Sequence, residues 1–173
     1  MSNNPSNNPS KTQSKNPSKI ASRQPLSVTV EREIAASPDV IYGLISDVTR
    51  MGMWSPETTK AKWLGSTTGP AVGAKFQGYN AIGRIKWSTK PTVTEADPGR
   101  RFAFKVPGSA GPLWTYELTA TPHGTLVRES MKQERRSPGL IRMLQRFGGV
   151  TDRETHLHQA MTTTLARLAA HVA

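Results

Sequence analysis

The sequence predicts an α+β fold in which a curved antiparallel sheet of about seven strands wraps around one long C-terminal helix. Residues 151–172 place apolar side chains three and four positions apart, which puts them on one helical stripe: Leu157, Met161, Leu165, Leu168 and Val172. Residues 57–134 instead alternate apolar and polar side chains in short runs between turns, as antiparallel strands do. We expect the sheet to supply the apolar surface on which the helix lies, with a ligand cavity between them.

A strand and a helix open the predicted domain. Residues 26–34 alternate and are expected to form the first strand. Ser37 as N-cap and Pro38 at the first helical position start a helix. An apolar stripe defines its buried face: Val40, Ile41, Leu44, Ile45 and Val48. Gly52 and Pro56 then break the helix.

Six further strands are expected, separated by turn residues. Their ranges are 60–64, 74–80, 84–95, 101–106, 113–121 and 125–135. Pro91 implies a bulge or an edge in the strand over 84–95, and Asp-Pro-Gly at 97–99 signals a hairpin. A short amphipathic helix over 138–147 follows, and Thr151 with Glu154 reads as a capping box that starts the long helix.

Residues 1–24 are expected to form a disordered, basic, low-complexity tail, so that the domain spans 25–173. Serine recurs at every fourth position of the tail from residue 2 to residue 22, and the tail carries four basic and no acidic side chains. Such a composition does not bury enough apolar surface to offset the entropy of ordering. The net charge of the whole chain is +11, which fits a solvated basic surface, or attraction to anionic lipid or nucleic acid.

Several classes of chemistry are excluded or unsupported by the composition. The 173 residues include no cysteine, which excludes disulfides and thiolate catalysis. No apolar run approaches the ~18 residues of a membrane span, and no signal-type segment is found at the N-terminus, so a cytoplasmic protein is expected. No phosphate-binding loop or Ser-His-Asp set is present, and two histidines two residues apart on a helix do not share a face. We therefore expect neither a metal nor a cofactor.

A family resemblance rests on four stretches: I-A-A-S-P-D-V-I-Y-G-L-I-S-D-V, M-W-S-P-E, T-G-P-A-V-G-A-K-F-Q-G-Y-N and T-V-T-E-A-D-P-G-R-R-F-A-F-K-V. They resemble the SRPBCC (START / polyketide cyclase/dehydrase-like) superfamily of actinobacterial type, over about residues 26–172. The resemblance implies a helix-grip (START-like) fold with two short helices after the first strand. It also implies a hydrophobic cavity that binds lipids, polyketides or other apolar molecules. Its members range from cyclases to carriers, so it does not imply one activity.

Aromatic side chains are candidates for the lining of that cavity. Alternation places six of them on the expected inner face of the sheet: Phe76, Trp87, Phe102, Phe104, Trp114 and Tyr116. Trp54 and Trp63 are expected near its rim. Such rings either pack as ordinary core or line a ligand pocket, and the helix-grip topology favours lining. Met131, Leu157 and Met161 complete the apolar candidates.

Glu129 is the most informative polar candidate. It shares its strand face with apolar residues two positions away, so its carboxylate is expected inside, where it needs a partner. Arg153 and His156 near the start of the long helix are candidate partners. The set reads either as a structural ion pair between strand and helix, or as a polar anchor or acid/base group for a ligand. Asn80 shares a face with Phe76 and reads as a turn-adjacent hydrogen bond or as a ligand contact.

The expected function is the binding or carriage of a hydrophobic small molecule or lipid. A polyketide cyclase/dehydrase-type enzyme is the alternative. The basic helix over 138–147 reads as a packed helix, as a lid over the cavity, or as a transient contact with anionic membrane. A regulatory or nucleic-acid partner rests on charge alone, and no specific nucleic acid is expected. The chain is expected to be a monomer or a homodimer.

Overall fold

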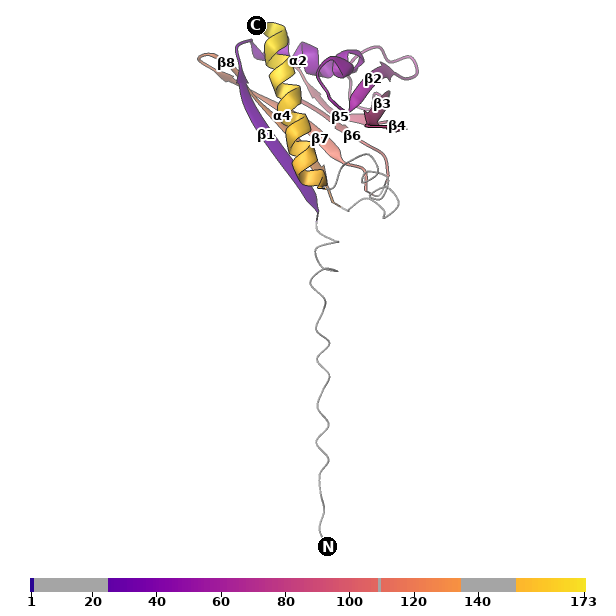
Figure 1. Ribbon diagram of the computed structural model, residues 1–173. Helices are drawn as coiled ribbons and strands as arrows, with labels where there is room; N and C mark the ends of the chain where they lie inside the picture. The colour runs from indigo at the N-terminus through magenta and orange to yellow at the C-terminus, as the bar shows by residue number, and fades with distance from the viewer. Residues whose placement is uncertain (2–24, 109, 135–151) are drawn as a thin grey trace.

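The structure, a computed structural model, describes residues 1, 25–108, 110–134 and 152–173 (Figure 1). The expected tail, apart from Met1, and the expected helix over 138–147 lie outside these residues. The elements in chain order are β1 (Leu26–Ile34), α2 (Pro38–Ser46), the 3-10 helix η1 (Val48–Met53), β2 (Thr58–Trp63), β3 (Phe76–Ile82), β4 (Ile85–Thr89), β5 (Thr92–Asp97), β6 (Arg101–Lys105), β7 (Leu113–Thr121), β8 (Gly124–Gln133) and α4 (Arg153–Val172). The predicted α+β class and helix-grip architecture are confirmed.

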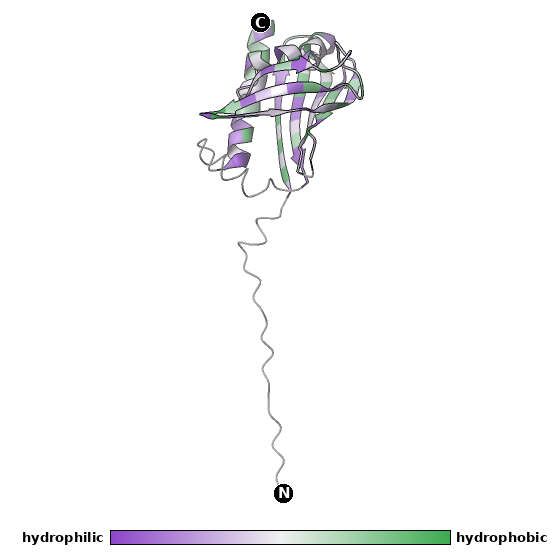
Figure 2. Cartoon of the chain, turned by 90° about the vertical axis from the view of Figure 1, so that its right-hand side faces the viewer, coloured by the Kyte–Doolittle hydropathy of each residue, from purple (hydrophilic) through white to green (hydrophobic). Residues whose placement is uncertain are grey.

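The strands form two antiparallel sheets. Sheet A has the order β1-β8-β7-β6-β5, and sheet B has the order β2-β3-β4. A bridge between Lys75 and Thr92 joins them, and the N–H of Phe76 donates to the carbonyl of Pro91 over 3.2 Å. Apolar and polar residues interleave along the strands (Figure 2), so one face of each sheet is directed to the interior.

The expected single strand over 84–95 is wrong. The chain forms β4 and β5 there, and the two strands belong to different sheets. Pro91 is the physical reason, because it has no N–H with which to continue a ladder. The bulge or edge expected at Pro91 is therefore a complete break, and the described residues contain eight strands.

The start of α2 follows the sequence prediction. The hydroxyl of Ser37 accepts the N–H of Val40 over 3.4 Å, and Pro38 takes the first helical position. The other residues of the predicted stripe are buried, but Val40 is 51% exposed, so its assignment to the buried face is wrong. At 100° per residue, Val40 lies about 90° from the centre of that stripe.

Helix α2 ends at Ser46, before the expected break, and η1 carries the chain on to Met53. Gly52 allows η1 to lie directly against β2. A Cβ atom at Gly52 would lie 2.5 Å from the carbonyl oxygen of Thr59, closer than van der Waals contact permits. A glycine is therefore required where these two elements meet.

Helix α4 lies across β1 and β8 of sheet A (Figure 1). Its predicted apolar stripe is buried to 1% exposure or less at Leu157, Met161, Leu165 and Leu168. In the described part of the chain, no helix combines the length and apolar composition that a membrane crossing needs.

The expected capping box of α4 is wrong. Thr151 lies outside the described residues, and the N-cap is Asp152, whose carboxylate accepts the N–H of Glu154 over 3.0 Å and the hydroxyl of Thr155 over 2.6 Å. Aspartate is as strong an N-cap as threonine, and here it stands next to the first helical residue.

Candidate functional site

A circuit of secondary structure encloses the buried interior. On one side α4 packs on β1, an edge strand of sheet A. On its other side α4 contacts the segment from Trp54 to Glu57 at two points. The guanidinium of Arg167 donates to the carbonyl of Trp54 over 3.5 Å, and Arg153 binds Glu57. Strand β2 begins directly after Glu57 and leads into sheet B, which the bridge to β5 joins to sheet A. The circuit is thus closed.

Two rows of cross-strand neighbours line the inner face of sheet A. The first row is Val30, Glu129, Tyr116, Phe102 and Ala96. The second row is Val28, Met131, Trp114, Phe104 and Val93. In the first row, Glu129 and Tyr116 bring polar atoms into the middle of a surface that is otherwise apolar.

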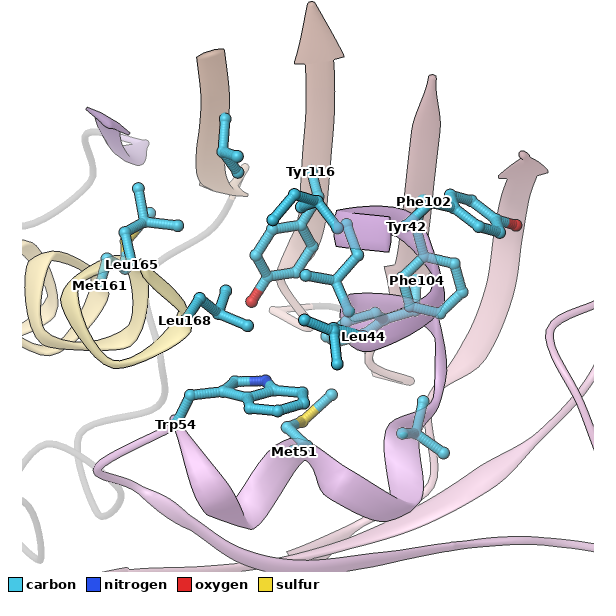
Figure 3. Close-up of a cluster of buried hydrophobic side chains, with 14 of the residues drawn as sticks. Tyr42, Leu44, Met51, Trp54, Phe102, Phe104, Tyr116, Met161, Leu165 and Leu168 are labelled. Atoms are coloured by element: carbon cyan, nitrogen blue, oxygen red, sulfur yellow. The ribbon is translucent and has the colours of Figure 1, made fainter. Parts of the chain in front are cut away.

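Glu129 and Tyr116 form a buried hydrogen-bonded pair. Their exposed fractions are 2% and 6%, and the Tyr116 hydroxyl donates to Oε1 of Glu129 over 2.8 Å. Figure 3 shows the Tyr116 ring directed from the sheet toward Leu168 of α4 and toward Trp54 after η1. The second oxygen of Glu129, Oε2, is buried and accepts no hydrogen bond in the described part of the chain. Leaving such an oxygen unpaired costs about 1–3 kcal/mol.

Burial determines the protonation state of this pair. It raises the pKa of Glu129 to about 8, while the hydrogen bond from Tyr116 acts in the lowering direction. Burial, with the charge and hydrogen bond of Glu129, also raises the pKa of Tyr116 well above its ordinary value. Near pH 7 the carboxyl is therefore mostly protonated. Because Oε1 accepts the phenol proton, Oε2 is the oxygen free to carry the acid proton. The pair presents a neutral O–H donor to an apolar interior.

The expected contact of Glu129 with Arg153 or His156 is wrong. Both side chains bind Glu57 instead: the Arg153 nitrogens lie 2.6 and 3.1 Å from its two oxygens, and His156 Nε2 lies 2.9 Å from Oε1. The physical reason is the course of α4, whose first turn faces the segment before β2. We call Glu57, Arg153 and His156 the Glu57 clamp. It fastens the start of α4 to the approach to sheet B.

Four of the six rings expected on the inner face are buried, namely Phe76, Phe102, Phe104 and Tyr116. Phe76 meets Phe104 edge to face with ring centroids 5.2 Å apart, and Trp114 stacks on Phe104 at 6.4 Å. The other predicted lining tryptophans, Trp63, Trp87 and Trp114, are half-buried. Trp63 lies edge-on to Phe76 with centroids 5.8 Å apart.

The remaining predicted residues divide between interior and sheet B. Met131, Leu157 and Met161 are buried to 2% exposure or less. Asn80 is half-buried, and its Oδ1 accepts the Thr58 hydroxyl over 2.9 Å across the β2–β3 ladder. Its hydrogen bond therefore joins two strands rather than closing a turn. Ligand contact by any of these side chains stays a prediction.

Three interior or bridging residues were not found by sequence reasoning. Trp54, expected near the rim, is only 3% exposed. Tyr42 lies off the predicted stripe of α2, yet it packs edge to face on Phe102 with centroids 6.5 Å apart. Glu57 carried a weak signal, as a lone carboxylate at the start of the alternating region. Figure 3 shows Trp54 near Tyr116 and Tyr42 beside Phe102.

Comparison with known proteins adds a family and structural relatives. Residues 25–173 match the family model described as "Polyketide cyclase / dehydrase and lipid transport". Among curated proteins no match is found. The Polyketide_cyc-like protein Cgl2372 from Corynebacterium glutamicum is 29% identical, with a TM-score of 0.55 over 86% of this chain and 92% of that one.

Two more distant structures share the fold. The major latex-like protein 151 of Panax ginseng is 15% identical, with a TM-score of 0.63 over 86% of this chain and 97% of that one. The di-domain ARO/CYC StfQ of the steffimycin biosynthetic pathway is 14% identical, with a TM-score of 0.66 over 85% of this chain and 50% of that one. The family match spans the whole of the domain that the resemblance indicated. The chain therefore belongs to the polyketide cyclase/dehydrase and lipid transport family.

Proposed function

We propose that the protein binds an uncharged hydrophobic small molecule or lipid in the interior between sheet A and α4. The observation that carries the proposal is the Glu129–Tyr116 pair, whose free oxygen Oε2 is buried among apolar side chains. A buried polar atom of this kind ordinarily has a partner. A ligand oxygen would supply that partner and offset the unpaired state.

The protonation state of Glu129 selects the chemistry of the ligand. With its pKa raised to about 8, the carboxyl is a hydrogen-bond donor near pH 7. It therefore suits a ketone, ester or hydroxyl oxygen on an otherwise apolar molecule. The surrounding rings Phe102, Phe104 and Trp114 favour a ligand with flat, unsaturated or aromatic parts.

Two measurements test the proposal. Native mass spectrometry of the protein purified from its own host should detect a co-purified apolar molecule. Titration with Nile red, a neutral fluorophore with a ring carbonyl, should give saturable binding. Glu129→Met keeps the side-chain volume and should weaken binding about three- to tenfold, the worth of one hydrogen bond, whereas Glu154→Gln on the exposed face of α4 should not. An empty protein that also fails to bind Nile red would remove the proposal.

A second candidate function is catalysis of the polyketide cyclase or dehydrase type. It is favoured by the pKa of Glu129, because a value of about 8 lies close to the operating range of a general acid or base. Glu129→Gln separates the two functions, since an amide keeps the hydrogen bonds but transfers no proton. An enzyme would convert a poly-β-ketone thioester and lose turnover in Glu129→Gln, with binding retained. A carrier would bind the same compound and release it unchanged in both forms.

A further inference from the structure

The charge of the domain is concentrated on sheet B. Residues 58–94 contain six basic side chains and not one aspartate or glutamate. This stretch includes all of β2, β3 and β4. The five lysines among the six are Lys60, Lys62, Lys75, Lys86 and Lys90, and we call their surface the lysine face.

The strand register puts three of these lysines on one side of sheet B, and Lys75 and Lys90 flank its strands. Lys60 lies opposite Tyr79, and Lys62 lies opposite Gln77. On the other edge of β3, Lys86 lies opposite Ala81. The alternate positions point inward and are buried, as at Ala61, Phe76 and Ile82. All five lysines are exposed. Sheet B, which lies at the right in Figure 1, therefore presents a lysine-rich outer face.

The outer face of sheet A is built differently. There Arg101 pairs with Glu95 and Glu117, and Arg128 pairs with Glu31. Acidic and basic side chains thus neutralise one another across neighbouring strands. On the lysine face, none of the ion pairs found among the described residues involves a lysine. Its positive charge is left for a partner.

An uncharged loop adjoins the lysine face. It joins β2 to β3 over residues 64–74 and contains no ionisable side chain. Lys62 and Lys75 stand on either side of it. At its far end Val72 is 69% exposed, one of the few large apolar side chains that the described structure leaves in solvent. Lysines beside an exposed apolar side chain combine the two attractions that an anionic membrane surface offers.

We propose that the lysine face and the Val72 loop dock the protein on a membrane surface that carries anionic phospholipids. Lysine ammonium groups bind phosphates as point charges and need no fixed geometry, which suits mobile headgroups. An exposed valine gains from contact with acyl chains but nothing from a nucleic-acid backbone. This docking rests on the surface charge and the exposed Val72, so it is independent of the ligand proposed for the interior.

Vesicle co-sedimentation of the full chain tests the proposal. Vesicles of phosphatidylcholine mixed with phosphatidylserine should retain the protein, and vesicles of phosphatidylcholine alone should not. Each lysine near the surface strengthens partitioning about fivefold. Lys60→Gln, Lys62→Gln and Lys86→Gln together should therefore weaken it roughly a hundredfold. The matched control removes the same charge elsewhere, with Arg32→Gln, Arg100→Gln and Lys132→Gln.

The outcomes separate the sources of binding. The control set should lose less than about tenfold, because charges away from the contact act only through the screened field. Val72→Ser should weaken vesicle binding further without altering net charge. An equal loss of vesicle binding in the triple lysine variant and in the control variant would overturn the proposal that the lysine face docks on the membrane. Binding of a duplex oligonucleotide in preference to the mixed vesicles would assign the face to nucleic acid and overturn the proposal as well.

Discussion

Because burial raises the pKa of Glu129, we expect the protein to lose stability as the pH rises through neutrality. The pKa of its carboxyl is about 8 in the folded protein, against an ordinary value of 4.5 in the unfolded chain. Between these values the folded state holds one proton that the unfolded state has released, so the free energy of unfolding falls with rising pH. The contribution is fully present below about pH 4.5, is lost progressively, and is gone above about pH 8.

The size of the effect follows from the shift. Each pH unit in this window is worth about 1.4 kcal/mol, so the total loss is roughly 5 kcal/mol. A domain of this size has a stability of about 5–15 kcal/mol, so the loss is a large part of the whole. No discount for solvent is needed, because Glu129 is only 2% exposed.

Urea unfolding at a series of pH values from about 5 to 8.5 measures this contribution, with Glu129→Gln as the reference. The other ionisable groups titrate in both proteins, so the difference between the two curves isolates Glu129. We expect that difference to change in favour of Glu129→Gln by about 1.4 kcal/mol per pH unit. A difference that stays constant, or that favours the original protein as pH rises, would refute the reasoning. The carboxyl carbon resonance of Glu129 should titrate near pH 8.

Three further perturbations have defined outcomes. In a double-mutant cycle, Tyr116→Phe and Glu129→Met should each lower the free energy of unfolding by about 1–3 kcal/mol, because each leaves the other side chain unpaired. The double variant should have nearly the stability of the original protein. Additive losses in chemical denaturation would contradict this coupling. Glu57→Ala should lower the free energy of unfolding by about 1 kcal/mol and speed amide hydrogen exchange in the first turn of α4. Unchanged exchange in that turn would count against the Glu57 clamp. Gly52→Ala should destabilise by about 1–3 kcal/mol, whereas Gly43→Ala, with open space around its Cβ position, should be neutral or stabilising in thermal melts.

The fold was predictable where local pattern decides the structure. Strand β7 begins and ends where alternation places it, because turn residues bound it on both sides. The break between β4 and β5 was missed, because Pro91 signals a discontinuity without saying how large it is. Val40 was assigned wrongly for another reason, since it lies about 90° from the centre of the stripe and is therefore left exposed at its margin.

The site was predictable only in part. The inward direction of Glu129 follows from period-two alternation along one strand. Its partner Tyr116 does not, because that contact depends on which strand pairs with β8 and in which register. Sequence reasoning left two interpretations of Glu129 open, an ion pair with a cation of the helix and a polar anchor or acid/base group for a ligand. Burial without a nearby cation instead favours the protonated form, and the phenol of Tyr116 hydrogen-bonds one of its two oxygens.

The two attachments of α4 differ in strength, and this indicates where a ligand would reach the interior. Against sheet A the helix buries four large apolar side chains, each worth about 1.5–3 kcal/mol. Its first turn is fastened toward sheet B by the Glu57 clamp, whose side chains are 15–32% exposed and which is worth only about 1 kcal/mol. The start of α4 should therefore separate from the approach to β2 before it leaves sheet A. That opening would lead to the inner faces of both sheets.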